Sequence, residues 1–158
     1  MDLRRPSQTG ASVPNAGSLS DDVATPESLV DAAYRLISFG PGGEPGWSSF
    51  RRLFADRSVL ALRVFPEDPA VSVMTLDEYI GRQVREGMHE MGYEERPLDC
   101  VVAVTGDIAE ARVRFQMVFG PQRVHDAVDV FQMVRCQGRW WIVSIISEIA
   151  GSRAEQRA

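Results

Sequence analysis

The chain has 158 residues, of which 44% are hydrophobic and 25% are charged. This length and composition suit one globular domain with a sizeable core, and they exclude a disordered chain. The formal net charge of -5 disfavours binding to phosphate backbones, which requires a positive field. We therefore expect no nucleic-acid partner.

No stretch of the sequence has the apolar length of a secretory core or of a membrane span. A cytoplasmic protein without membrane attachment is expected. Cys100 and Cys136 each lie within an apolar strand pattern, which predicts two buried free thiols rather than a disulfide. With only two histidines in the chain, the sequence predicts no metal site.

Composition divides the chain into three parts. Residues 1–24 are rich in Ser, Gly, Pro and Asn and are predicted to form a flexible arm. Residues 25–150 are predicted to form the folded domain, and residues 151–158 a polar tail. The domain is expected to begin with a helix, because Thr25 suits an N-cap and Pro26 the first helical position. Apolar residues from Leu29 onward then recur at helical spacing.

Two more helices are predicted before the period of the pattern changes. Residues 47–57 have the apolar spacing of a short helix, and residues 58–65 are rich in β-branched residues, which predicts a strand. Thr75 can then cap a third helix together with Glu78, and this helix is expected to run to Gly92.

After Gly92 the apolar pattern alternates with a period of two. It predicts four strands at residues 97–105, 108–119, 125–136 and 139–150, separated by short turns. Short connections favour an antiparallel meander, and the preceding helices must cover one of its faces. The sequence therefore predicts an α+β fold with a mostly antiparallel sheet.

Three local sequences accompany this order of elements: LVDAAYRLISFG, FRRLFAD and VDVFQMVRCQGRWWIVS. Together they resemble the nuclear-transport-factor-like superfamily. This superfamily includes SnoaL-like polyketide cyclases, ketosteroid isomerase and scytalone dehydratase. The resemblance spans residues 26–149. It implies a cone in which a curved sheet wraps around the N-terminal helices and encloses a mostly apolar pocket. It also implies a homodimer and no obligatory cofactor.

The resemblance implies candidate catalytic residues. Asp129 matches the acid of the isomerase branch, and Tyr34 matches the tyrosine on its first helix. In that branch the two side chains donate hydrogen bonds to a developing oxyanion. The carboxylate base of that branch corresponds to Leu62, which cannot accept a proton, so the isomerase mechanism is disfavoured. His125 is a further candidate, although four strand residues, about 13 Å, separate it from Asp129.

Strand alternation places Asp129 on one face with Phe131 and Met133, which predicts that these two residues contact a ligand. Leu62 and Trp141 complete the expected ligand contacts. Alternation also places Arg112 and Arg114 on one face of their strand, but it does not decide whether that face meets solvent, a second subunit or, with Arg114 opposite Asp129, the pocket. An outward-facing member of the Trp140–Trp141 pair would favour a dimer interface.

Three functions remain open on the sequence alone. The first is binding of a small apolar molecule in the pocket without chemistry, which the leucine at position 62 favours. The second is an isomerase, cyclase or dehydratase acting on a polycyclic or apolar substrate through Tyr34, Asp129 and His125. The third is a non-catalytic dimerisation domain whose pocket is filled by its own side chains.

Overall fold

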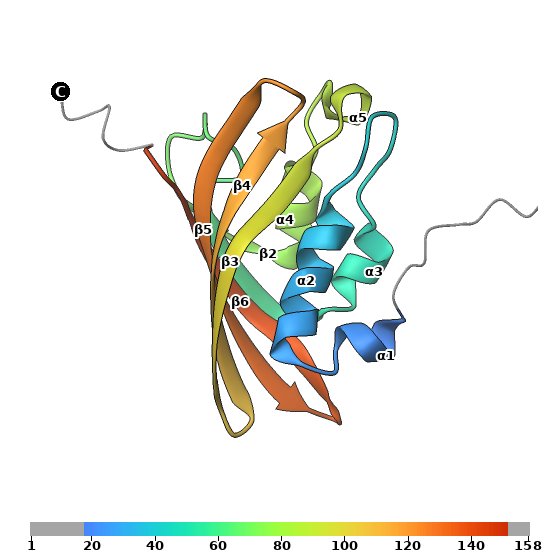
Figure 1. Cartoon of the computed structure of the whole chain (residues 1–158), viewed down its shortest axis with the longest axis vertical. Coiled ribbons are helices and arrows are strands. Elements are labelled where there is room, and N and C mark those ends of the chain that lie inside the picture. The colour runs from blue at the N-terminus through green and yellow to red at the C-terminus, as the bar shows by residue number, and fades with distance from the viewer. Residues whose placement is uncertain (1–17, 152–158) are drawn as a thin grey trace, which may run out of the picture.

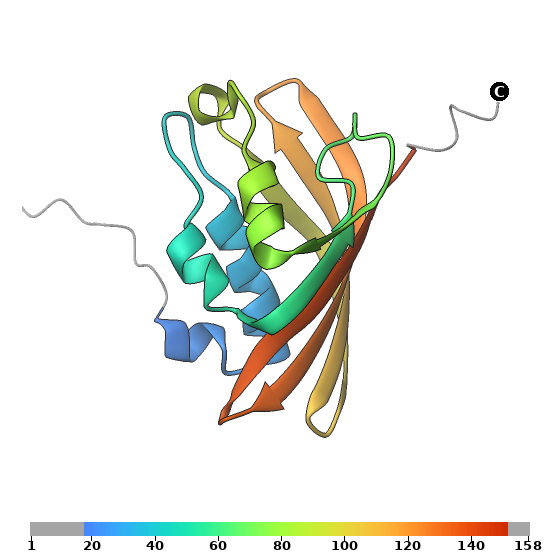
Figure 2. The same cartoon turned by 180° about the vertical axis from the view of Figure 1, so that it is seen from behind.

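The computed structural model describes residues 18–151. A six-stranded sheet curves around one layer of helices, which all lie on its concave side (Figures 1 and 2). The helices are α1 (Leu19–Asp22), α2 (Pro26–Ile37), α3 (Trp47–Arg51), α4 (Leu76–Gln83) and α5 (Met88–Met91). The strands are β1 (Phe54–Leu62), β2 (Ser72–Thr75), β3 (Glu94–Thr105), β4 (Ile108–Phe119), β5 (Arg123–Cys136) and β6 (Arg139–Ile149).

The sheet has the strand order β2-β1-β6-β5-β4-β3 and is open at both edges. All neighbouring strands are antiparallel except β1 and β6, which are parallel. The predicted meander is therefore confirmed for β3 to β6. The strand β1, formed much earlier in the sequence, joins it beside β6.

Helix α2 crosses the concave face of the sheet, where it contacts β3, β4 and β6. The predicted cap is confirmed, because the Thr25 hydroxyl accepts from the Ser28 amide at 3.0 Å and Ser28 Oγ accepts from the Thr25 amide at 3.1 Å. Its apolar face, including Leu29, Val30 and Ile37, is buried against the sheet. Burial of this face is the main source of stability for such a helix.

Two predicted helices are shorter in the structure. The helix expected over residues 47–57 ends at Arg51, because Leu53 already accepts a sheet hydrogen bond from Ile142. The helix expected up to Gly92 ends at Gln83, since Val84 is extended and Gly87 has a φ of 84°. The short strand β2 was not predicted.

The predicted arm and thiols also differ from expectation in the described residues. Residues 19–22 form the turn of helix α1, and the Val23 carbonyl accepts from the Trp140 amide at 3.0 Å. Residues 1–17 and 152–158 lie outside the described residues, so the predicted arm and tail stay predictions. Cys100 and Cys136 are exposed rather than buried, because both lie on strand positions that face solvent. None of the helices in residues 18–151 has the length and apolar content of a membrane span.

Candidate functional site

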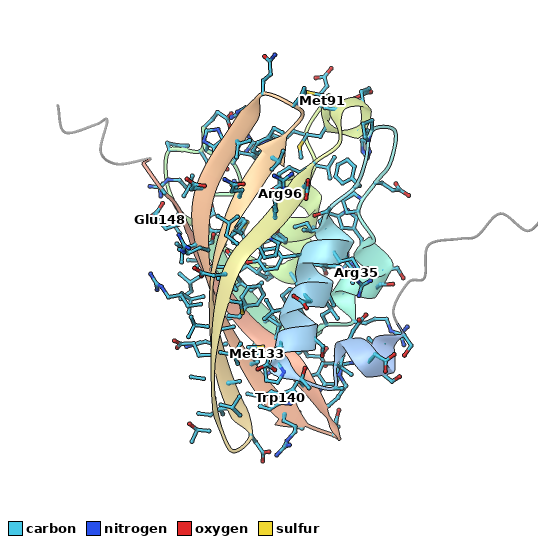
Figure 3. The ribbon with its side chains drawn as sticks, viewed as in Figure 1. Arg35, Met91, Arg96, Met133, Trp140 and Glu148 are labelled. Atoms are coloured by element: carbon cyan, nitrogen blue, oxygen red, sulfur yellow. The ribbon has the colours of Figure 1, made fainter. Side chains whose placement is uncertain are left out.

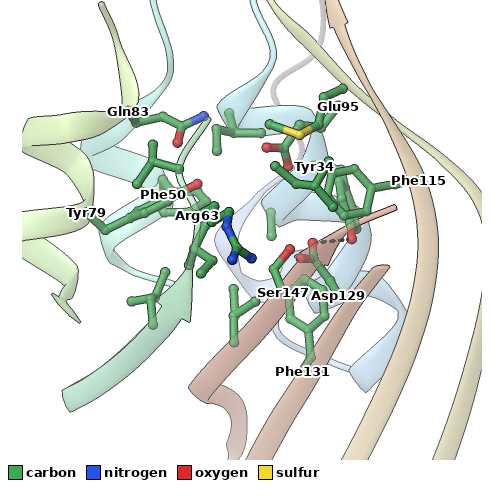
Figure 4. A pocket seen from close by; sticks show the side chains of 18 residues that line it. Tyr34, Phe50, Arg63, Tyr79, Gln83, Glu95, Phe115, Asp129, Phe131 and Ser147 are labelled. Atoms are coloured by element: carbon green, nitrogen blue, oxygen red, sulfur yellow. Dashed lines mark hydrogen bonds between the residues drawn. The ribbon is translucent and has the colours of Figure 1, made fainter. Parts of the chain in front are cut away.

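A cavity lies between the concave face of the sheet and helices α2 and α4 (Figure 4). Its walls are mostly apolar and aromatic, and they include Phe50, Leu60, Leu62, Phe115, Phe131 and Ile145. The cavity volume is ≈ 30 Å³, which is room for one or two water molecules. The pocket is therefore nearly filled by its own side chains.

Asp129 projects from β5 into this cavity. Alternation along the strand buries Ala127, Asp129, Phe131 and Met133 on the concave face, as the sequence predicts. The Tyr34 hydroxyl on α2 donates to Asp129 Oδ2 at 2.6 Å, and Ser147 on the neighbouring strand β6 forms a second hydrogen bond with the carboxyl. Only 6% of Asp129 is exposed. The structure thus brings together the two residues that the sequence proposed as a pair.

Burial changes the acidity of both members of the pair. It raises the pKa of Asp129 to about 6, although the hydrogen bonds from Tyr34 and Ser147 oppose the rise by stabilising the carboxylate. The pKa of the Tyr34 phenol is raised far above its ordinary value by burial and by the neighbouring carboxylate. Tyr34 therefore stays neutral and acts as a hydrogen-bond donor at every physiological pH.

A second carboxyl, Glu95, lines the same cavity from the first residues of β3. The Tyr93 hydroxyl donates to Glu95 Oε1 at 2.7 Å, and the Glu95 amide donates to Ser38 Oγ at 3.0 Å. Burial and the nearby charge of Asp129 raise the pKa of Glu95 to about 8, and the bond from Tyr93 opposes this rise. Two carboxyl groups in one apolar cavity hold one proton between them near neutral pH.

The sequence prediction missed Glu95 because it began the strand at Pro97. Glu95 pairs with Met117, an inward-facing residue of β4, so extending the strand by two residues would have placed its side chain on the concave face. Tyr79 and Gln83 of α4 and Arg63 after β1 were also missed as cavity residues. Arg63 is held by Glu148 at 2.7 Å.

The other proposed site residues are divided between the cavity and regions outside it. Leu62 and Phe131 line the cavity. Met133 is buried, but it lies at the lower end of the sheet near Trp140 and away from the cavity (Figure 3). His125 and Trp141 were also predicted at the site, but neither residue lines the cavity.

His125 lies near the beginning of β5, where its ring is 6.2 Å from that of Phe119. Burial and the charge of Arg123 lower its pKa. The strand carries His125 beyond the end of the cavity, four residues from Asp129. Within residues 18–151 the imidazole forms no hydrogen bond with Asp129 or Glu95, and its Nε2 accepts from Arg123 Nε at 3.3 Å.

Trp141 and the charged row of β4 belong to the outer face of the sheet. Trp141 donates from Nε1 to the Cys136 carbonyl at 3.1 Å, and the guanidinium of Arg139 lies 3.6 Å from the centre of one of its rings. Arg114 pairs with Asp99 on the neighbouring strand and does not face Asp129. The alternative that placed Arg114 in the pocket wall is therefore wrong. Within residues 18–151, no three His, Cys, Asp or Glu side chains are arranged to hold a metal ion.

No protein-family model matches the sequence, and no curated protein is similar to it. Solved structures do match. An NTF2-like protein of unknown function from Silicibacter pomeroyi covers 78% of this chain and 91% of its own, with a TM-score of 0.55 and 16% identity. A second one, from Methylobacillus flagellatus, covers 79% and 89%, with a TM-score of 0.53 and 14% identity.

An NTF2-like protein with a cystatin-like fold, from Novosphingobium aromaticivorans, covers 69% of this chain and 72% of its own, with a TM-score of 0.53 and 15% identity. Identities this low establish the fold alone. They agree with the curved sheet and the covering helices described above. The chain has the NTF2-like, cystatin-like fold that its resemblance to the nuclear-transport-factor-like superfamily predicted.

Proposed function

We propose that the cavity binds a small, mostly apolar molecule and anchors one polar group of that molecule at the Tyr34–Asp129 pair. The observation that carries the proposal is the 2.6 Å hydrogen bond between these side chains inside an aromatic wall. A buried carboxyl destabilises a fold compared with an apolar residue of similar size. Its presence in the wall of the cavity therefore supports a role in binding rather than in packing.

The small volume restricts the ligand and the way it enters. A cavity of ≈ 30 Å³ does not hold an aromatic ring without rearrangement. Met117 and Leu62 are wall residues with several accessible rotamers, and the Arg63 guanidinium is paired with Glu148. Binding of a ring-sized molecule therefore requires these side chains to rotate outward.

The test is a binding titration with phenol and benzene, followed by the nuclear magnetic resonance signals of isotope-labelled protein. We expect phenol to bind more tightly than benzene, and the difference to disappear in Asp129→Leu. A hydrogen bond to a charged group contributes about 1.5–3 kcal/mol, so the loss should be roughly tenfold or more. Asp126→Leu makes the same substitution at an exposed position of β5 and serves as the control. If neither probe binds saturably, the result would favour a non-catalytic dimerisation domain.

Acid–base catalysis is a second candidate, and Glu95 is the observation that favours it. The sequence offered no carboxyl group besides Asp129 in the pocket, whereas the fold supplies one from β3. Carboxyl groups with pKa values of about 6 and about 8 can take and give a proton near neutral pH. Such a pair suits isomerisation or dehydration of a small carbonyl compound.

Deuterium exchange next to the carbonyl group of cyclohexanone, in heavy water, tests this candidate. In this reaction a carbon–hydrogen bond breaks, the carboxylate takes the proton, and the electron pair moves toward the carbonyl oxygen. Exchange faster than in buffer, and reduced at least tenfold in both Asp129→Asn and Glu95→Gln, would support catalysis. Exchange at the buffer rate would leave binding as the proposed function.

We also propose a homodimer formed through the outer face of the sheet. This face, which the helices leave uncovered, exposes a group of apolar side chains: Val59, Val73, Val101, Val143 and Ile146. The outward position of Trp141 extends this group. Exposed apolar surface of this kind is typical of subunit contacts, and a two-fold pairing would cover the same surface on both copies.

A further inference from the structure

Helix α4 carries two buried polar side chains on the face that lines the cavity. Tyr79 is 5% exposed and Gln83 is 2% exposed, and the spacing of four residues places both on one side of the helix. The helix is fixed at its beginning by the Thr75 hydroxyl, which accepts from the Glu78 amide at 3.2 Å. The Tyr79 ring also stacks on Phe50, with 6.3 Å between the ring centres.

The Tyr79 hydroxyl and the Gln83 amide form no hydrogen bond with any residue in the range 18–151. The other two tyrosines differ, because Tyr34 donates to Asp129 and Tyr93 donates to Glu95. Every described side-chain nitrogen or oxygen that is sealed within the protein has a partner. The polar groups of Tyr79 and Gln83 therefore border the open space of the cavity, into which Figure 4 shows both side chains pointing.

Unpaired buried polar groups destabilise a fold, because they lose their bonds to water without replacement. A phenylalanine and a methionine would fill the same positions without this loss. Burial and the carboxyl groups of Glu95 and Asp129 raise the pKa of Tyr79, so its hydroxyl stays neutral and can both donate and accept. The Gln83 amide likewise offers both kinds of bond.

The two polar regions lie on opposite walls. Asp129, Tyr34 and Ser147 belong to the side of β5, β6 and α2, whereas Tyr79 and Gln83 belong to α4, and Figure 4 shows the Arg63 side chain between these two regions. A molecule that spans the cavity would meet hydrogen-bonding groups at both ends, and between them it would pass the mostly apolar lining and Arg63, whose guanidinium is paired with Glu148.

We propose that Tyr79 and Gln83 form a second polar anchor, so that the ligand is a small bifunctional molecule with an oxygen-bearing group at each end of an apolar body. This inference rests on the proposed function, because it assigns the opposite end of the same ligand. A hydroxyl or carbonyl group suits the α4 end, since it can accept from the Gln83 amide and pair with the Tyr79 hydroxyl.

The test compares two probes of nearly equal shape. Hydroquinone, kept under argon, carries hydroxyl groups at both ends, and para-cresol carries a methyl group in place of one of them. We expect the protein to bind hydroquinone roughly tenfold more tightly than para-cresol. In Gln83→Met and Tyr79→Phe this preference should shrink to less than twofold.

A structural role for Gln83 would give a different result. We expect the Gln83 amide to be unpaired in the free protein, so Gln83→Met should raise the melting temperature measured without ligand. A melting temperature lowered by several degrees would overturn the inference. Equal affinity for the two probes, with para-cresol binding still dependent on Asp129, would show that only water occupies the α4 end. Failure of both probes to bind saturably would overturn the proposed function together with this inference.

Discussion

The buried carboxyl of Asp129 makes the stability of the protein depend on pH in a way that one substitution should remove. Its pKa is raised on folding from 3.8 to about 6, chiefly by burial. The folded protein therefore holds a proton that the unfolded chain releases between about pH 4 and about pH 6. The contribution of Asp129 to the free energy of unfolding should fall as the pH rises through this window and then level off.

The size of this fall follows from the two pKa values. Each pKa unit corresponds to about 1.4 kcal/mol, so ionisation of Asp129 should lower the free energy of unfolding by about 3 kcal/mol. Glu95 contributes in the same direction up to about pH 8, because its pKa is also raised by burial and by Asp129. The combined decrease should therefore continue beyond pH 6 in the wild-type protein.

Asp129→Asn removes the ionisation while keeping the shape and the acceptor for the Tyr34 hydroxyl. Between pH 4 and pH 8, urea denaturation should show a smaller loss of stability for this variant than for the wild type, because burial still raises the pKa of Glu95. At pH 8 the variant should be about 3 kcal/mol more stable than the wild type. It should also lower the pKa of Glu95, because the neighbouring charge is gone. Asp126→Asn controls for the removal of one carboxyl from β5. Parallel pH profiles for the wild type and Asp129→Asn would show that Asp129 is well solvated and would refute the reasoning.

Three further outcomes are expected. Removal of residues 1–24 should lower the melting temperature by several degrees relative to removal of residues 1–17, because only the longer truncation deletes the buried Val23, and thermal unfolding followed by circular dichroism measures the difference. Ile146→Lys should convert the proposed dimer into a monomer in sedimentation at micromolar concentration, and a monomeric wild type would contradict the dimer. Gly92→Ala should destabilise the fold by more than about 1 kcal/mol in urea, because φ is +77° and a Cβ atom would lie 2.9 Å from the Pro41 nitrogen.

Strand positions were predictable wherever alternation was strict and turns were short. The limits of β4 agree with the predicted residues 108–119, because every second side chain from Ala109 to Phe119 is buried. The helix predicted to reach Gly92 was too long, since Arg85 leaves the helix to lie over the Phe65 ring and to pair with Asp68. Such tertiary contacts override a local pattern and are not visible in it.

The candidate site was predictable only in part. Asp129 could be found because an acid among apolar residues of a strand is conspicuous, and Tyr34 because the family resemblance matched it to a tyrosine on the first helix. Glu95 lies in a polar stretch that looks solvated, and only pairing with Met117 turns it inward. Gln83 has no sequence signal, since its burial depends on where α4 packs. Asp129, Glu95 and Gln83 come from β5, β3 and α4, and the periodicity of a sequence does not show which residues of different elements meet in the fold.

The parallel pairing of β1 and β6 determines when the cavity can form. Strand β6 lies between β1 and β5, so it alone connects the β1–β2 hairpin with the β3–β5 meander. During synthesis Leu62 and Asp129 therefore belong to separate pieces of sheet until the last strand emerges and inserts. Such long-range pairing slows folding and exposes strand edges in the interval. A nascent chain that lacks β6 consequently has no enclosed site, and ligand can stabilise only the finished domain.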